Sequence, residues 1–344
     1  MGELKKKILV VDSSAVVRRY LIKLLSESGY DVDFAKNGQE ALDKLEESHF
    51  SLVTLDIELP ILNGIETLKE IMKRKPTRVL MLSSSVDSHD DISSQTLELG
   101  AIDYIEKPKN SIDIVKISEN ILNKVKYSLL IIPKFIKQNL EPFKIHKTKI
   151  DIDVKMGFVL IGASTGGPRL IEQICKTLPP SYPHAVCIVQ HMPSDFTSNF
   201  AKRLNTLSNV EVIEADNGVE LKKSRVIIAK GGKHLHFRKK LKIYTVSLVS
   251  NVRDRFFVPS VDEMFFSATE VLPCKNILAI ELTGIGDDGA DGMVELRKNS
   301  AYTIAESEKS AVVYGMPKEA YIRGGAKKVL DFNDILDEII KYGQ

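Results

Sequence analysis

The sequence of 344 residues has few features of a secreted, membrane-bound or disulfide-linked protein. Its three cysteines, Cys175, Cys187 and Cys274, are too few and too scattered for a disulfide framework or a zinc site. Each has apolar neighbours, which favours small core side chains over reactive thiols. No run approaches the ~18 apolar residues of a membrane-spanning helix, and the first apolar stretch is too short for a signal peptide. We therefore expect a cytoplasmic protein without membrane insertion.

Net charge is also low, only +2 at pH 7, so no overall field attracts the chain to nucleic acid. The charge is unevenly distributed, with a net −5 in residues 1–123, +5 in 124–155 and +2 in 156–344. A chain of 344 residues suggests about two domains. We expect an acidic domain at 1–123, a basic linker at 124–155 and a near-neutral domain at 156–344.

Both predicted domains alternate between short apolar runs and amphipathic segments. In the first, runs such as "KILVVD" and "LVTLD" predict strands, and segments such as "SAVVRRYLIKLLSES" and "DISSQTLELG" have helical spacing. Five strands and five helices predict one parallel sheet covered on both faces. In the second, "FVLIGAS", "AVCIVQH", "RVIIAKGG" and "NILAIELTG" predict a larger, mainly parallel α/β sheet, with irregular segments at 231–262.

Polar residues end four predicted strands of the first domain: Asp12, Asp56, Ser83 and Lys107. Open α/β sheets bind ligands at the carboxyl ends of their strands. Two carboxylates, a hydroxyl and an amine at that edge suit a divalent cation, such as Mg²⁺, together with a phosphoryl group. A single strand-terminal Asp often caps the next helix, but four polar strand ends together favour a functional site.

The order and spacing of "VVDSSAVVRR", "LVTLDIELP", "VLMLSSS" and "YIEKP" resemble a response-regulator receiver domain over residues 1–123. The resemblance implies a flavodoxin-like fold with a five-stranded parallel sheet, in which Asp56 accepts a phosphoryl group from a histidine kinase. It also implies Mg²⁺ ligands and residues that contact the phosphoryl group or switch with it, namely Asp12, Asp56 and the Glu58 carbonyl for the metal, and Ser83, Lys107 and Tyr104 for the switch.

One position departs from the receiver pattern. Receivers of this type usually have two adjacent acids after the first strand, and here the second is Ser13. Because a carboxylate ligand is lost, we expect weaker Mg²⁺ binding and slower phosphorylation.

Three polar residues follow predicted strands of the second domain: Ser164, His191 and Asp288. A serine hydroxyl becomes a nucleophile when a base takes its proton, and that base must be oriented by a third group. "GASTG" fits the G-x-S-x-G pattern, but the order Ser, His, Asp differs from the usual α/β-hydrolase order. The residues therefore indicate triad chemistry on another α/β fold.

Other interpretations of the second domain have less support. "GASTGG" is not the G-x-G-x-x-G of dinucleotide binding, and the expected ribose-binding acid is absent. With "TGIGDDG" it could still form phosphate loops of a nucleotide-binding module. His234 and His236 in "KHLHF" lie on one side of a strand, but no nearby acid or cysteine supports a metal pair. A DNA-binding output would need a basic recognition helix in a domain that is strand-rich and almost neutral.

The motifs "IGASTGGPR", "QHMPSDFTSNFAKRLN", "PSVDEMFFSA" and "LTGIGDDGADGM" resemble the catalytic domain of the chemotaxis protein-glutamate methylesterase. The resemblance implies hydrolysis of glutamate methyl esters on chemoreceptors, with Ser164 as nucleophile, His191 as base and Asp288 as its partner, and probable deamidation of receptor glutamines. It implies no cofactor for the esterase chemistry. Backbone amides near Thr165, Ile285 and Gly286 would meet the oxyanion.

The family also implies a regulatory arrangement, in which the unphosphorylated receiver covers the active site. Phosphorylation at Asp56 would loosen that contact and act as a population shift between closed and open arrangements. A second departure concerns the substrate, because relatives commonly have a His-Arg pair where this chain has Phe257 and Val258. We expect receptor recognition to differ there.

Overall fold

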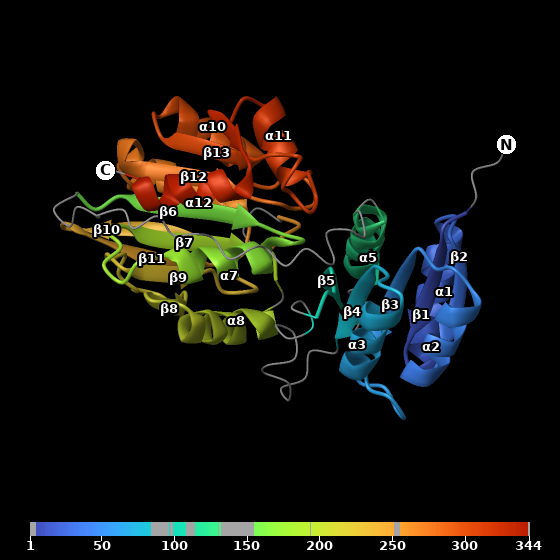
Figure 1. Cartoon of the computed structure of the whole chain (residues 1–344). Coiled ribbons are helices and arrows are strands. Elements are labelled where there is room, and N and C mark those ends of the chain that lie inside the picture. Colours follow the sequence, from blue (N-terminus) through green and yellow to red (C-terminus); the bar gives the residue numbers. More distant parts are fainter. Residues whose placement is uncertain are drawn as a thin grey trace. The chain divides into compact units, whose positions relative to one another are not determined.

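The computed structural model contains two compact units, Met1–Asn139 and Leu140–Gln344 (Figure 1). The described residues are 5–83, 96, 99–107, 114–129, 131, 155–192, 194–250 and 255–342. Much of the predicted basic linker, residues 132–154, lies outside them. None of the described helices is long and apolar enough to span a membrane.

The first unit is a five-stranded parallel sheet with the order β2-β1-β3-β4-β5, as the flavodoxin-like prediction requires. Its strands are β1 (Lys7–Val11), β2 (Asp31–Ala35), β3 (Leu52–Asp56), β4 (Val79–Ser83) and β5 (Asp103–Glu106). The central strands β3 and β4 are buried along their whole length, because helices cover both faces.

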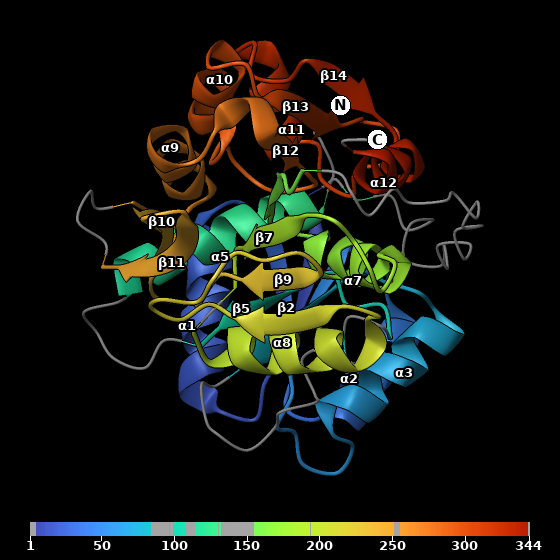
Figure 2. The ribbon, with the colours of Figure 1, turned by 90° about the vertical axis from the view of Figure 1, so that its left-hand side faces the viewer.

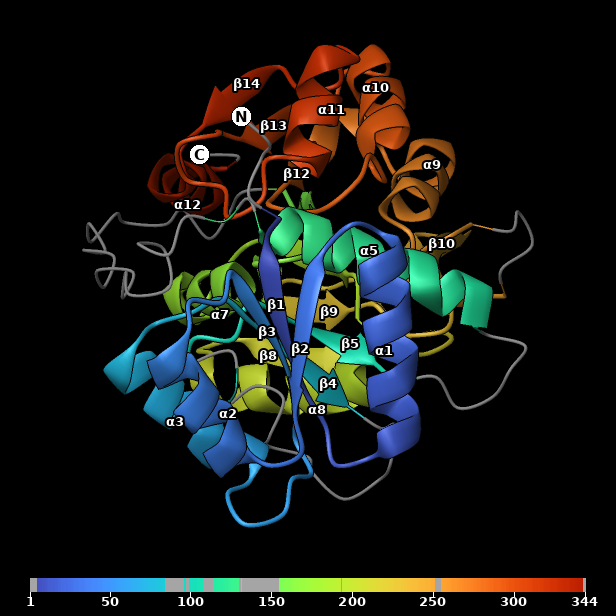
Figure 3. The same ribbon diagram turned by 90° about the vertical axis from the view of Figure 1, so that its right-hand side faces the viewer.

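Four described helices cover this sheet. They are α1 (Ala15–Glu27), α2 (Gly38–Glu47), α3 (Gly64–Arg74) and α5 (Ile114–Ser128). Figure 3 shows α1 and α5 on one face and α2 with α3 on the other. The side chains of Ser14, Asn37 and Asn63 cap the first three helices by accepting a backbone N–H. The predicted helix "DISSQTLELG" lies almost entirely outside the described residues, and α5 continues past residue 123.

The second unit is built on a seven-stranded parallel sheet with the order β14-β13-β12-β6-β7-β9-β8. The strands are β6 (Phe158–Ala163), β7 (Ala185–Gln190), β8 (Glu211–Glu214), β9 (Arg225–Ile228), β12 (Ile277–Glu281), β13 (Tyr302–Glu306) and β14 (Lys328–Leu330). The predicted doubly wound, mainly parallel fold is confirmed, although the sequence patterns miss β13 and the short edge strands β8 and β14.

Helices lie on both faces of the larger sheet (Figure 2). One face has α7 (Gly167–Thr177), α8 (Ser194–Leu207) and α12 (Phe332–Lys341), and the other has α9 (Val261–Val271), α10 (Ala290–Lys298) and α11 (Met316–Ile322). Two of the cysteines, Cys175 and Cys187, are buried in this unit. Burial raises the pKa of the Cys175 thiol to about 12, as expected for a core side chain.

The segment predicted to be irregular, 231–262, contains regular structure. An antiparallel hairpin joins β10 (His234–Lys240) to β11 (Ile243–Val249), and α9 begins at Val261. In β10, Leu235 and Phe237 pack into the core, whereas His236 between them is only partly buried.

Candidate active site and receiver site

The three predicted triad residues come from three neighbouring strands at the centre of the larger sheet. Ser164 follows β6, His191 follows β7, and Asp288 lies in the turn between β12 and α10. His191 Nε2 lies 2.7 Å from Asp288 Oδ2. Within the described residues, Ser164 Oγ makes no hydrogen bond to His191. The structure thus pairs the histidine with the aspartate and leaves the serine hydroxyl unengaged.

The Asp288 carboxylate is held by donors from α9 as well as by His191. Oδ1 accepts from the Ser260 hydroxyl at 2.7 Å and from the Asp262 N–H at 3.2 Å, and Oδ2 accepts from the Val261 N–H at 2.7 Å. Burial by itself would raise the pKa of Asp288, but these hydrogen bonds lower it below its ordinary value. The N-terminus of a helix favours an anion, so the site keeps this carboxylate charged.

The pairing with Asp288 determines which nitrogen of His191 can act as a base. Because an ionised carboxylate only accepts hydrogen bonds, Nε2 of His191 carries the proton. The lone pair then lies on Nδ1, which is buried and has no hydrogen-bond partner among the described residues. His191 is therefore oriented by Asp288, and its Nδ1 remains available as a base among the described residues.

The turn that carries Ser164 depends on glycine and on a clamp from β7. Gly166 has φ of 85°, a conformation that glycine adopts without steric cost, and α7 begins at the next residue. The Gln190 side-chain amide donates to the backbone carbonyls of both Ser164 and His191, at 2.9 and 3.1 Å. One buried amide thus fixes the spacing of the two backbones.

The predicted oxyanion donors lie beside the serine. A Cβ placed on Gly284 would lie 2.9 Å from the Ser164 Cβ, so the serine side chain faces the turn after β12. In that turn the backbone N–H groups of Ile285 and Gly286 donate to no acceptor within the described part of the chain. Thr165 is buried, and its carbonyl accepts from the Thr283 hydroxyl at 2.9 Å. The turn after β12 thus has backbone donors available near Ser164.

The residues at the start of α9 that donate to Asp288 are not among those predicted from the sequence. Besides donating to Asp288, Ser260 caps α9, and its backbone N–H donates to His234 Nδ1 at 3.1 Å. The signal was present as "SVDE", a serine followed three residues later by glutamate, which is typical of a helix start. The Ser260 N–H thus gives the buried His234 a hydrogen-bond partner within the protein. The other histidine of this strand, His236, has its Nε2 3.2 Å from Glu263 Oε2. Among the described residues, no cluster of three or more His, Cys, Asp or Glu could hold a metal ion.

Three further acids, Asp262, Glu281 and Glu306, are buried near the turn between β12 and α10 that carries Asp288. Burial raises the pKa of Asp262 to about 6 and that of Glu306 to about 7. Glu281, on the central strand β12, is fully buried, and neither carboxyl oxygen has a hydrogen-bond partner among the residues described. Burial raises its pKa well above the ordinary value, with the charge of Asp288 as a further cause. Burial therefore disfavours the charged form of Glu281.

In the first unit, the structure brings Asp12, Asp56 and Lys107 together at the carboxyl edge of the sheet. Lys107 Nζ lies 2.9 Å from Asp12 Oδ2 and 2.7 Å from Asp56 Oδ2. Burial raises the pKa of Asp56, and the lysine only partly offsets this effect. Ser83 ends the neighbouring strand β4 and is also buried, as is Tyr104 on β5.

The replaced acid position lies at the rim of this site. Ser13 Oγ donates to the Glu58 carbonyl, the predicted third metal ligand, at 3.4 Å. The Asp56 carboxylate in turn accepts the Glu58 N–H at 3.1 Å. The donor set of two carboxylates and one carbonyl consists of oxygen atoms, which fits Mg²⁺.

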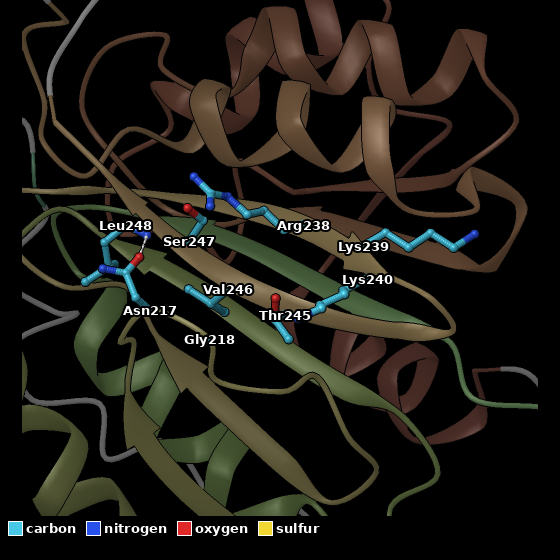
Figure 4. Close-up of a pocket in the computed structure, with 9 residues that line it drawn as sticks. All are labelled: Asn217, Gly218, Arg238, Lys239, Lys240, Thr245, Val246, Ser247 and Leu248. Carbon is cyan, nitrogen blue, oxygen red and sulfur yellow. Dashed lines mark hydrogen bonds between the residues drawn. The ribbon is translucent and has the colours of Figure 1, made fainter.

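A separate hollow of about 670 Å³ lies on the β10–β11 hairpin (Figure 4). Its basic side chains come from β10, and its lining residues are Asn217, Gly218, Arg238, Lys239, Lys240, Thr245, Val246, Ser247 and Leu248. None of the three predicted catalytic residues lines it, so it is not the site of the chemistry described above.

The fold and the site thus define a two-unit protein, a receiver followed by a parallel α/β unit with a paired histidine and aspartate. Comparison with known families agrees: residues 8–119 match the response regulator receiver domain, and residues 159–339 match the CheB methylesterase family. The chain belongs to the CheB methylesterase family. The resemblance inferred from its motifs is confirmed, and the DNA-binding and nucleotide-binding alternatives are set aside.

Individual relatives extend over nearly the whole chain. A protein-glutamate methylesterase/protein-glutamine glutaminase of Carboxydothermus hydrogenoformans is 38% identical, with 98% of this chain and 99% of the relative covered. A protein of the same name from Thermotoga maritima is 37% identical, with 97% and 98% covered. The solved methylesterase catalytic domain of Thermotoga maritima CheB is 35% identical with a TM-score of 0.52, and covers 55% of this chain and 99% of that domain.

Proposed function

We propose that this protein hydrolyses γ-methyl esters of glutamate on chemoreceptors and releases methanol, under control of phosphorylation at Asp56. The names of its relatives support a methylesterase and glutaminase. The observation that carries the proposal is the 2.7 Å contact between His191 Nε2 and Asp288, which leaves the buried Nδ1 without a hydrogen-bond partner among the described residues. Its role is adaptation in chemotaxis, and the substrate is a receptor at its array.

Acylation begins when Ser164 Oγ attacks the ester carbonyl and its proton passes to Nδ1 of His191. The tetrahedral intermediate carries its negative charge on the former carbonyl oxygen. Backbone N–H groups of Ile285 and Gly286, with a contribution near Thr165, stabilise that charge, and such donors are commonly worth about 3 kcal/mol. The imidazolium then protonates the methoxy oxygen, the C–O bond breaks, and methanol leaves.

Deacylation repeats these steps with water. His191 takes a proton from the water, the hydroxide attacks the acyl-enzyme, and the imidazolium returns the proton to Ser164 Oγ. The product is the glutamate carboxyl group. A glutamine side chain passes through the same tetrahedral arrangement and releases ammonia instead of methanol, which gives the glutaminase activity. Asp288 stays ionised throughout and stabilises the imidazolium.

Control comes from the receiver. A carboxylate oxygen of Asp56 attacks the phosphorus of a phosphohistidine on the kinase, and the N–P bond breaks. Mg²⁺, held by Asp12, Asp56 and the Glu58 carbonyl, would neutralise phosphoryl charge. Lys107 and Ser83 are the side chains that contact the bound phosphoryl group, and Tyr104 reorients with them. Ser13 makes this step slow, because it supplies no carboxylate to the metal.

The first test is methanol release from methylated chemoreceptor membranes by the full chain and by Ser164→Ala. Loss of the nucleophile should lower turnover by about 10⁴-fold or more. A Ser307→Ala variant serves as the control, because the Ser307 hydroxyl donates to Asp331 at the start of α12 and makes no hydrogen bond to the three predicted catalytic residues within the described part of the chain. Equal release by Ser164→Ala and the wild type would overturn the assignment of the nucleophile.

A further inference from the structure

The ring of Phe257 packs face to face on the imidazole of His191. The two ring centroids are 4.0 Å apart and the planes differ by 10°. The same phenyl ring reaches the oxyanion turn, since a Cβ placed on Gly286 would lie 3.9 Å from its Cε2. Phe257 is half-buried, and its ring covers one face of the His191 imidazole.

The segment that carries Phe257 is anchored on both sides of the ring. Before it, Arg255 Nε donates to Glu263 on α9 at 3.1 Å. After it, the Val258 carbonyl accepts the Gly232 N–H at 3.0 Å, and Ser260 donates to Asp288. The segment therefore holds the phenyl ring in place with contacts that do not involve His191.

We propose that Phe257 is a positioning residue for the catalytic base: the face of its phenyl ring holds the imidazole plane and stabilises the imidazolium that forms during the reaction. This inference rests on the proposed function. Hydrogen bonding to Asp288 fixes one nitrogen of His191 but leaves the ring free to rotate about that contact, and the stack removes this freedom. The face of an aromatic ring carries partial negative charge and attracts a cation positioned over it.

The neighbouring residue Phe256 is exposed and contacts Phe257 instead of His191. Its ring meets Phe257 edge to face, with centroids 4.8 Å apart, and 43% of its surface is exposed. No ring contact joins Phe256 to His191 among the described residues. Phe256→Leu is therefore a matched control for Phe257→Leu, because each replaces one phenyl ring by an aliphatic group.

The test compares the full-length wild type with Phe257→Leu, Phe257→Tyr and Phe256→Leu. The first measurement is the second-order rate at which a small fluorophosphonate labels Ser164, because this probe has no receptor contacts. Phe257→Leu keeps the bulk but loses the ring face, so labelling should slow by about tenfold. Phe257→Tyr restores the ring and should react at the wild-type rate, as should Phe256→Leu.

Methanol release gives the second measurement. In Phe257→Leu, kcat should fall by about tenfold while KM changes less than twofold, because the stack acts on the base and not on substrate binding. Labelling of Phe257→Leu at the wild-type rate would overturn the proposal, and so would a rise in KM with unchanged kcat. If Phe257→Leu does not fold, Phe257→Met takes its place with the same expectation.

Failure of the proposed function itself gives a different pattern. In that case the wild type is not labelled at Ser164 and releases no methanol, before any comparison of variants. Failure of the positioning role alone leaves the wild type active and Phe257→Leu equally so.

Discussion

The two units of this protein place an aspartate at the same edge of the same kind of sheet, yet they hold it in opposite ways. In the receiver, Asp56 faces Lys107, whose Nζ also contacts Asp12. Burial raises the pKa of Asp56. In the catalytic unit, Asp288 accepts fixed donors from the start of α9 and from His191, and its pKa falls below the ordinary value.

The difference matches the role that we propose for each carboxylate. An aspartate that accepts a phosphoryl group must exchange its partner, so its counter-ion lies on a long flexible side chain. An aspartate that orients an imidazole must not change during the reaction, so its charge is matched by backbone dipoles that need no reorganisation. In this proposal the two aspartates differ because Asp56 faces a flexible lysine side chain and Asp288 faces fixed donors. Four substitutions test this comparison.

The largest effect is expected for Asp288→Asn, which removes the fixed negative charge. The amide cannot accept all the bonds that now converge on the carboxylate, and it favours the wrong tautomer of His191. We expect kcat for methanol release to fall by about 10⁴-fold, with the fold retained by circular dichroism. A loss below tenfold would show that the charge of Asp288 is not needed.

Lys107→Met tests the mobile counter-ion of the receiver. Asp12 and Asp56 would face each other without a cation, so the unfolding free energy of the receiver should fall by about 4 kcal/mol at neutral pH. Mg²⁺ should stabilise this variant more than the wild type, because no ammonium competes with it. Thermal unfolding with and without Mg²⁺ measures both effects.

Lys44→Met is the control for that substitution. Lys44 forms an ion pair of 2.6 Å with Asp33, but both side chains are about one-third exposed. Such a pair is worth about 1 kcal/mol or less. Equal losses in the two lysine variants, or an identical response to Mg²⁺, would contradict the account of the receiver site.

Glu306→Gln addresses a carboxyl group that lacks a strong counter-charge. Its pKa is raised from the ordinary value of 4.5 to about 7 in the folded state by burial, despite hydrogen bonds from Thr283 and Ser310. The stability it contributes is fully present below pH 4.5 and is lost as the pH rises through about 7. Between those limits the wild type should lose on the order of 3 kcal/mol relative to Glu306→Gln. Urea unfolding at several pH values measures this, and parallel pH profiles would contradict it.

The smallest effect is expected for Ser260→Ala, which removes one of the four donors to Asp288. The α9 N–H groups and His191 remain, so kcat should fall by only about tenfold. Ser267→Ala is the control, because Ser267 lies on α9, the helix that Ser260 caps, and its hydroxyl accepts the Phe237 N–H of β10 instead of contacting Asp288. A loss as large as that of Asp288→Asn would mean that the helix N-terminus contributes little.

The sequence predicts the fold and the strand-end residues because both depend on local patterns. Apolar runs that stop at Ser164 and His191 mark strands and their ends within a few residues. The partners of Asp288 are not local, since what the start of α9 faces depends on packing between elements far apart in the chain. Glu281 is the clearest case, because a lone acid in "ILAIEL" gives no sign that it is wholly buried.

The clamp from Gln190 bears on how this enzyme tolerates change in length. Its amide ties the carbonyls of Ser164 and His191 directly, and the residues that lie between Ser164 and the start of β7 take no part in that contact. Insertions or deletions in the loop between α7 and β7 should therefore leave the distance between nucleophile and base unchanged. The length of this loop can therefore change without a change in the spacing of the Ser164 and His191 backbones, as long as Gln190 is kept.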